Sequence, residues 1–319
     1  MTSSANLDRM IEVYRSVLSD LQPDAVAQAS AEIRQIGRLY TETRPSLLGR
    51  FLVNRNHAGS EHSGWLLQFH ASGYIREKAF QELSDPPQSA FEFVAVVYRM
   101  NDWVAQVREA AFAYAQRLFP LTEPKIVATA ALFLFRQAGH LARWDRRAAR
   151  LVEETLYHDK VLEILKAHLL QVTDGPVVRV LRSALRRPDL DSFLPELALN
   201  AKSAAIRSCA ADAVLNRRAC WAEGYKRVWV NKAYGVSRRV ADLRHRSLSV
   251  TVNIRKHMDL AAQDRSAQVR RVAASLLSEQ YAKPLPWHAN IAERLRQDRN
   301  LSIATRMAFY FRKRAEAEA

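Results

Sequence analysis

Ala267-Gln268-Val269-Arg270-Arg271-Val272-Ala273 is the stretch that decides the fold. Asp264 and Ser266 stand just before it and can cap a helix, because their side-chain oxygens accept the free N–H groups of a first helical turn. Apolar residues recur at helical spacing through and beyond this stretch, which predicts an amphipathic helix with one buried face. Such a helix is ordinary by itself, and it becomes informative because the chain repeats the pattern.

The repeated pattern is an aliphatic or small residue, then arginine, then a small or apolar residue three places later. Its arginines are Arg34, Arg76, Arg108, Arg179 (a poor match), Arg207, Arg238, Arg270 and Arg306. The steps between them are 42, 32, 71, 28, 31, 32 and 36 residues. The longest step divides into two of about 35 if a degenerate copy lies near Arg143, and such a period with two helices per repeat is typical of an α-solenoid.

The repeated unit resembles the HEAT repeat family. The resemblance is carried by an acidic residue or Asn in a turn, followed by Val/Ile-Arg-x-x-Ala at the start of the second helix, and residues 264–273 and 102–111 are its best copies. It covers nearly the whole chain, and it is silent on function. Together with the period, it predicts an all-α protein: a single right-handed α-solenoid of about nine HEAT-like helix pairs over residues 1–319, with no sheet.

The expected helices follow from apolar periodicity, capping residues and prolines. They cover residues 7–20, 23–40, 73–83, 88–100, 102–119, 124–137, 141–156, 158–172, 176–187, 202–217, 221–234, 237–250, 252–262, 266–281, 286–297 and 301–314, with a further helix between Pro188 and Pro195. The polar segment 54–64 predicts an exposed loop inserted into the first repeat, which explains the 42-residue step.

Several function classes find no support in the sequence. Two cysteines, Cys209 and Cys220, allow neither a disulfide framework nor a four-cysteine zinc site, and they fit a cytoplasmic protein. The N-terminus lacks a secretion signal, and the longest apolar run, 126–135, is too short to span a membrane. His57, Glu61, His62 and His70 lack metal-ligand spacing. We therefore expect no metal, no cofactor and no membrane partner.

Positive charge is concentrated toward the C-terminus. Residues 1–135 hold 13 Lys/Arg and 14 Asp/Glu, whereas residues 136–319 hold 35 and 19, so the chain's net charge of +15 lies in its C-terminal part. A one-sided basic surface is typical of a protein that binds a polyanion, although a merely solvated basic face remains the alternative.

The densest basic segment is 217–256, with eleven Lys/Arg against Glu223 and Asp242. Aromatic residues lie between its cations, a mixture that suits a nucleic-acid site because charge contacts the backbone and flat rings contact bases or sugars. For Trp229, helical spacing instead favours a place in the core. The candidate binding residues are Arg143, Arg146, Arg147, Arg179, Arg217, Arg218, Lys226, Arg227, Lys232, Arg238, Arg239, Arg244, Arg246 and Arg270.

The repeated arginines have two interpretations. In HEAT repeats the turn aspartate and the following arginine resemble a ladder that joins adjacent repeats, which favours a structural role for Arg76, Arg108, Arg207 and Arg270. Alternatively, arginines at the start of second helices could contact phosphates there. Both roles can occur at different repeats.

Trp144-Asp145 and Asp102-Trp103 suggest a second, weaker resemblance, to the HEAT-like alkylpurine DNA glycosylases. That resemblance implies an aspartate flanked by tryptophan rings, where the ring stacks on a damaged nucleotide and the carboxylate stabilises positive charge at the sugar. Asp145 beside Trp144 is the better candidate, and Asp102 better fits the turn aspartate of a repeat. A dipeptide is not a family motif, so catalysis is not the leading hypothesis.

The leading hypothesis is a non-catalytic binding scaffold whose basic C-terminal half binds nucleic acid, DNA more readily than RNA, or another acidic surface. The alternatives are a protein–protein adaptor, which would bind an acidic protein or dock through the near-neutral N-terminal half, and a DNA glycosylase. The sequence leaves the oligomeric state open.

Overall fold

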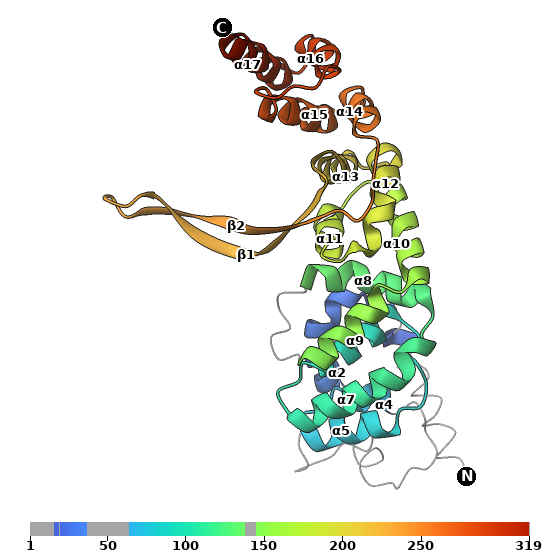
Figure 1. Ribbon diagram of the computed structural model, residues 1–319. Coiled ribbons are helices and arrows are strands. Elements are labelled where there is room, and N and C mark those ends of the chain that lie inside the picture. Colours follow the sequence, from blue (N-terminus) through green and yellow to red (C-terminus); the bar gives the residue numbers. More distant parts are fainter. Residues whose placement is uncertain (1–15, 19, 37–63, 138–144, 319) are drawn as a thin grey trace, which may run out of the picture. The chain divides into compact units, whose positions relative to one another are not determined.

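The computed structural model describes residues 16–18, 20–36, 64–137 and 145–318, and these fold into two compact units. Unit 1 comprises residues 1–164 and unit 2 comprises residues 165–319. Residues 54–63 of the predicted loop and most of the predicted helix 7–20 lie outside the described residues, whereas Gly64, the last residue of that loop, begins a helix. The described chain is mostly helical, as the sequence predicts, but it also contains a two-stranded antiparallel sheet (Figure 1).

Unit 1 is helical throughout its described part. Its elements are η1 (Pro23–Ala25), α2 (Val26–Ile36), α4 (Gly64–Leu67), α5 (Gly73–Glu82), α6 (Ala90–Arg99), α7 (Ala105–Leu118), η2 (Phe119–Leu121), α8 (Pro124–Gln137) and α9 (Arg146–Leu156). α5 packs on α7 and α6 packs on α8, so each helix contacts the one two places along the chain. The core between them is rich in large aromatic side chains such as Trp65, Phe93 and Tyr114.

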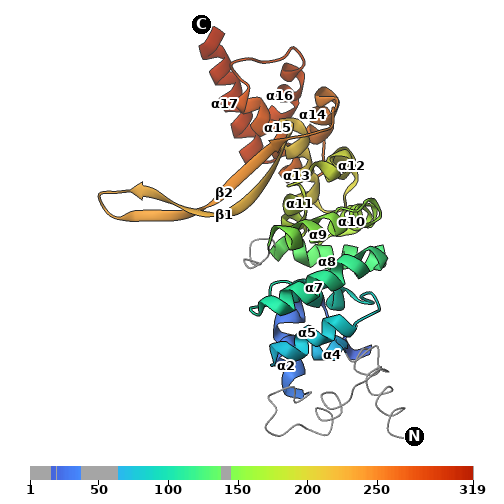
Figure 2. The ribbon, with the colours of Figure 1, turned by 60° about the horizontal axis from the view of Figure 1, so that its bottom comes forward.

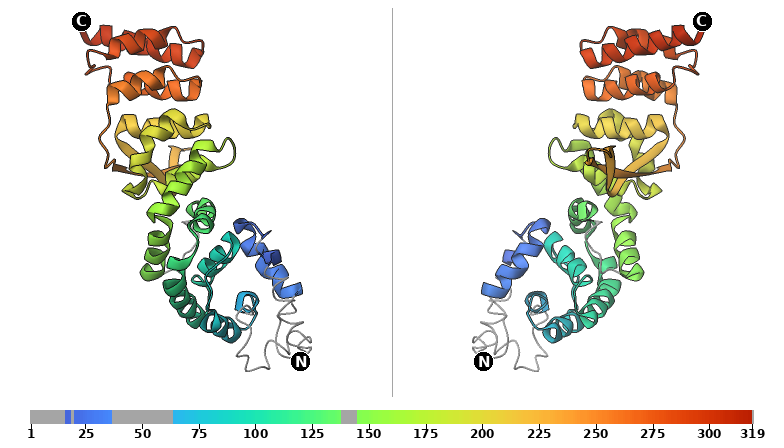
Figure 3. Two further views of the ribbon diagram at one scale, coloured as in Figure 1. Left: turned by 90° about the vertical axis from the view of Figure 1, so that its right-hand side faces the viewer. Right: turned by 90° about the vertical axis from the view of Figure 1, so that its left-hand side faces the viewer.

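Unit 2 combines helices with the sheet. α10 (Asp159–Gln171) crosses the boundary between the units, and then come α11 (Val177–Ala184), η3 (Pro188–Phe193), α12 (Leu194–Asn200), α13 (Ala204–Asn216), β1 (Arg218–Asn231), β2 (Val236–Ser247), α14 (Ile254–Ala262), α15 (Ala267–Glu279), α16 (His288–Arg296) and α17 (Leu301–Glu318). α13 packs on α15 and α15 on α17, while α12, α14 and α16 pair with them in turn. The three pairs form successive layers (Figure 3).

Local sequence sets where these helices begin and end. Asp145, Ser89, Asn253 and Ser266 each accept a backbone N–H of the following first turn, as the capping rule predicts. The predicted spans of most helices match the observed ones to within about two or three residues, a normal uncertainty at helix ends. The exceptions are α9, which begins five residues later than expected, and α12, which begins at Leu194 with Pro195 in its first turn instead of ending near that proline.

The structure differs most from the sequence-based prediction over residues 218–247, where apolar periodicity predicts two helices and no strand. The structure instead has an antiparallel hairpin, β1–β2, that projects from the helices of unit 2 (Figures 1 and 2). Its turn is closed by Gly235, which has a φ of 67° and donates its N–H to the Lys232 carbonyl. The side chain of Asn231 accepts the Tyr234 N–H within the same turn.

An insertion of repeat-like length explains that error. The hairpin leaves α13 at Arg217, and the chain returns beside it, where the Leu248 N–H donates to the Arg217 carbonyl. About thirty residues are thereby inserted between the two helices of the stack, close to the period that the repeats show. Arg238 consequently falls at the expected step without belonging to a repeat.

Candidate nucleic-acid interface

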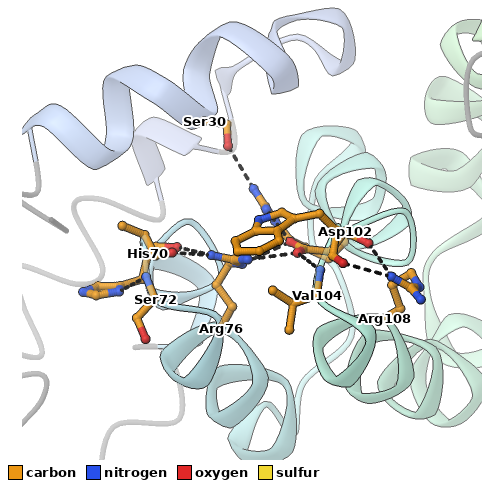
Figure 4. A network of polar contacts seen from close by, with 10 residues as sticks. Ser30, His70, Ser72, Arg76, Asp102, Val104 and Arg108 are labelled. Atoms are coloured by element: carbon orange, nitrogen blue, oxygen red, sulfur yellow. Dashed lines mark hydrogen bonds and ion pairs between the residues drawn. The ribbon is translucent and has the colours of Figure 1, made fainter. Parts of the chain in front are cut away.

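Three of the repeated arginines form buried ion pairs, which we call Arg–Asp clamps: Arg76–Asp102, Arg207–Asp264 and Arg270–Asp298. In each clamp, two guanidinium nitrogens donate to both carboxylate oxygens, at 2.6–3.0 Å. A third nitrogen donates to the carbonyls five and six residues earlier. The aspartate also accepts the backbone N–H two residues after it, so one carboxylate fixes both an adjacent repeat and its own turn (Figure 4).

The clamps confirm a structural role for Arg76, Arg207 and Arg270, each of which is joined to the aspartate of a later turn. Arg108 makes the same two carbonyl contacts, to Asp102 and Trp103. Arg270, a candidate phosphate contact, has a side chain only 10% exposed. Its guanidinium is occupied by Asp298 and does not belong to the exposed basic surface.

Charge balance within the clamps keeps the aspartates ionised. Burial of Asp102 opposes its ionisation, but hydrogen bonds from Arg76, the Val104 N–H and Arg99 outweigh that effect and lower its pKa. For Asp298, the hydrogen bond from Arg270 is the main cause of a lowered pKa. A neutral turn aspartate of this kind would not complete the clamp.

The base of the hairpin is fixed by a different buried pair, Arg246 with Asp191. The Arg246 guanidinium donates to both Asp191 oxygens, at 2.7 and 2.8 Å, and to the carbonyls of residues 185–187. Asp191 has no exposed side-chain area and also accepts the backbone N–H and hydroxyl of Ser249. Arg246, predicted as a phosphate contact, is therefore the anchor of β2, and no repeat spacing in the sequence points to Asp191 as its partner.

Beyond its base, the hairpin is exposed. Residues 217–247 hold nine Lys/Arg against two acidic residues. Apart from the anchor Arg246, the predicted cations all have exposed side chains: Arg217, Arg218, Lys226, Arg227, Lys232, Arg238, Arg239 and Arg244. The structure thus gathers these candidates on one projecting element, although the sequence analysis places them on helices.

The aromatic side chains of the hairpin are exposed as well. Trp229 is 47% exposed and Tyr225 is 69% exposed, so the prediction that Trp229 belongs to a core is wrong. The Arg227 guanidinium lies over the Trp229 ring at 5.7 Å, and that of Arg239 lies over the Tyr225 ring at 5.1 Å from the ring centroid. These distances are within the range of cation–π contacts.

The candidate cations at the start of α9 are less available for binding than those of the hairpin. Arg143 and Trp144 lie outside the described residues, Arg146 is exposed, and Arg150 pairs with Glu154. Arg147 pairs with Glu109 and Asp145 and lies over the Phe112 ring. Arg179 is exposed on α11 in unit 2.

Asp145, the candidate catalytic residue, caps α9 by accepting the Ala148 N–H at 2.7 Å. That hydrogen bond is the main cause of its lowered pKa, and the ion pair with Arg147 lowers it further. Asp102 belongs to a clamp, as the turn-aspartate prediction has it. Each carboxylate thus has a structural role.

The two units differ sharply in charge. Unit 1 holds 19 Lys/Arg and 19 Asp/Glu, whereas unit 2 holds 29 and 14, which places the whole net charge of +15 in unit 2. Within the described residues, no helix is long and apolar enough to cross a membrane, and no cluster of three potential metal ligands occurs. No family model matches this sequence, and no curated protein is significantly similar to it.

Proposed function

We propose that this protein is a non-catalytic scaffold that binds nucleic acid, DNA in preference to RNA, through the hairpin and the neighbouring surface of unit 2. The observation that carries the proposal is the exposed, projecting hairpin, with nine cations against two acids on the one unit that holds the excess charge. Such a surface binds phosphates favourably because each Lys or Arg contact releases counterions condensed on the nucleic acid.

The shape of the hairpin supports DNA over RNA. The major groove of B-form DNA admits a two-stranded β-ribbon, whereas the major groove of an A-form RNA helix is too deep and narrow for side chains to read. A strand of twelve residues spans about 40 Å, which is close to one turn of duplex DNA.

The helical part serves as the frame of this interface. We infer a HEAT-like α-solenoid, supported by the three clamps and by the stacking of each helix on the one two places along. In such an architecture each repeat buries its apolar face only against its neighbours. The clamps fix that stacking, and the hairpin extends from it without interrupting it.

Salt-dependent binding of duplex DNA tests the proposal. If about six cations contact phosphates, log K should fall against log salt with a slope near −5. Reversing Arg227, Arg238 and Arg239 to Glu should weaken binding and flatten the slope. Reversing three exposed cations of unit 1, Lys78, Arg117 and Lys125, controls for a general loss of charge and should matter much less.

Two outcomes would contradict the proposal. Equal weakening by both sets of reversals would indicate a diffuse field instead of a site. Failure of the parent protein to bind DNA at low salt would favour the adaptor alternative, in which the basic surface of unit 2 contacts an acidic protein.

A further inference from the structure

The two faces of the hairpin differ in how their charges are balanced. Side chains alternate along a strand, and the register of β1 and β2 assigns each residue to a face. One face, the stacked face, carries Arg218, Tyr225, Arg227, Trp229, Arg239 and His245. The other, the paired face, carries Trp221, Lys226, Arg238, Asp242, Arg244 and Arg246.

The acidic residues neutralise the paired face only. Lys226 pairs with Asp242 at 3.1 Å, and Arg244 pairs with Glu223, at the bulge of β1, at 2.8 Å. Arg246 is occupied by Asp191 at the base. Only Arg238, opposite Val228 near the tip, has no carboxylate partner among the described residues of this face.

The stacked face has the opposite character. Arg227 and Arg239 are direct cross-strand partners, and like charges in that position repel each other. No carboxylate of the described chain pairs with either one or with Arg218. The register therefore places two like charges opposite each other on an exposed face without a carboxylate, and a bound anion would relieve their repulsion.

The aromatic rings make these two guanidinium groups ready for binding. Each lies over a ring, Arg227 on Trp229 and Arg239 on Tyr225, which restricts the long side chain before any ligand arrives. Restriction in the free state lowers the entropy lost on association. A stacked guanidinium still presents N–H donors at its edge, in the fork that matches a phosphate.

We propose that the stacked face is the surface that contacts duplex DNA, with Arg227 and Arg239 bound to backbone phosphates and the paired face turned away from the duplex. This inference rests on the proposed function and adds which face binds and which two side chains make the central contacts. The net charge of the hairpin alone would not distinguish its faces.

A pair of matched double variants tests the assignment. Arg227→Gln with Arg239→Gln removes two cations from the stacked face, and Lys226→Gln with Arg244→Gln removes two from the paired face. All four side chains are exposed, and unchanged circular dichroism and protease patterns would verify the fold of both variants. Affinity for a fluorescent duplex of random sequence is measured by anisotropy between 50 and 200 mM salt, conditions in the range where phosphate contacts dominate.

The expected result is asymmetric. Loss of two phosphate contacts should reduce the salt slope by about 1.8 and weaken binding about 60-fold at 0.1 M salt. The paired-face variant changes net charge equally and should stay within about threefold of the parent, because its cations are already neutralised.

Each other outcome overturns the inference in a distinct way. Equal losses in both variants would indicate a diffuse field, and a larger loss in the paired-face variant would reverse the assignment. If the parent protein binds duplex DNA and neither variant binds it more weakly, the proposed function stands and this inference is wrong. If the parent protein does not bind duplex DNA, both the proposed function and this inference are wrong. If it binds single-stranded DNA or duplex RNA more tightly than duplex DNA, the assignment of duplex DNA as the ligand is wrong.

Discussion

Arginine has opposite roles in the helical stack and in the hairpin. Arg76 and Arg207 have side chains only 3% exposed, and each meets a carboxylate supplied by a later turn. Arg227 and Arg239 are exposed, lie over aromatic rings, and have no carboxylate partner among the described residues. A buried charge without a partner is strongly destabilising, whereas an exposed one costs little. Where an arginine lacks a carboxylate, its charge remains available to a ligand.

The largest effect should come from breaking a clamp. Asp102→Ala removes the acceptor for Arg76, Arg99 and the Val104 N–H and leaves the buried guanidinium of Arg76 and the half-buried one of Arg99 without a carboxylate. Breaking a buried pair in this way should cost about 3–5 kcal/mol. Urea denaturation followed by circular dichroism measures the loss, and Arg227→Ala, as the exposed counterpart, should change stability by less than about 0.5 kcal/mol. Equal losses of stability in the two variants would contradict the distinction between buried, paired arginines and exposed, unpaired ones.

Shortening the hairpin should separate binding from stability. Residues 223–242 are replaced by Asn-Gly, a sequence suited to a two-residue turn, which keeps the paired ends Ala222 and Leu243 and the anchor Arg246. We expect the helical signal to persist while DNA affinity falls at least 60-fold, the loss estimated for two phosphate contacts. Collapse of the helical signal would instead show that the stack depends on the hairpin.

A smaller effect is expected from the aromatic rings. Tyr225→Leu with Trp229→Leu keeps every charge but removes the surfaces on which the arginines are stacked. Binding should weaken about five- to thirtyfold while the salt slope stays constant, because the two cation–π contacts contribute about 0.5–1 kcal/mol each at exposed sites. A changed slope would indicate that the substitutions alter the phosphate contacts themselves.

The smallest effect concerns acid sensitivity in the core of unit 2. Burial, reinforced by Arg314, lowers the pKa of His288, whose Nδ1 accepts the Leu285 N–H. The folded state thus favours the neutral ring, so its stabilising contribution is present above the ordinary pKa of about 6.5 and declines as pH falls below it. Denaturation at pH 7 and pH 5 should show this decline, and His288→Gln should reduce it. An unchanged pH dependence in the variant would contradict this role.

The helical part could be predicted because two independent signals agree there. Capping residues and apolar periodicity mark most helices, and the turn aspartates mark the clamps. Asp264 and Asp298 lie in the turns that precede second helices, so their pairing with Arg207 and Arg270 follows from repeat register. The contact between Arg246 and Asp191 joins an insertion to the stack and has no such register.

The hairpin was missed because a weak periodic signal outweighed stronger local ones. Gly224 interrupts a predicted helix, and Asn231 and Gly235 flank a short turn between segments rich in valine and aromatic residues. Because Arg238 lies at the spacing expected for a repeated arginine, this segment fits the helical repeat pattern despite its strand and turn signals. The concentration of cations in this segment can be read from the sequence, since charge density does not depend on secondary structure, but their division between two faces requires strand alternation and register.

The anchor at Asp191 determines where mechanical load would travel. A force applied to the tip of the hairpin would reach the helices at its base, where Arg246 contacts Asp191 of η3. Arg207–Asp264 bridges α13 to the turn before α15 independently of the hairpin. Tension on the hairpin and cohesion of the stack therefore follow separate routes through unit 2.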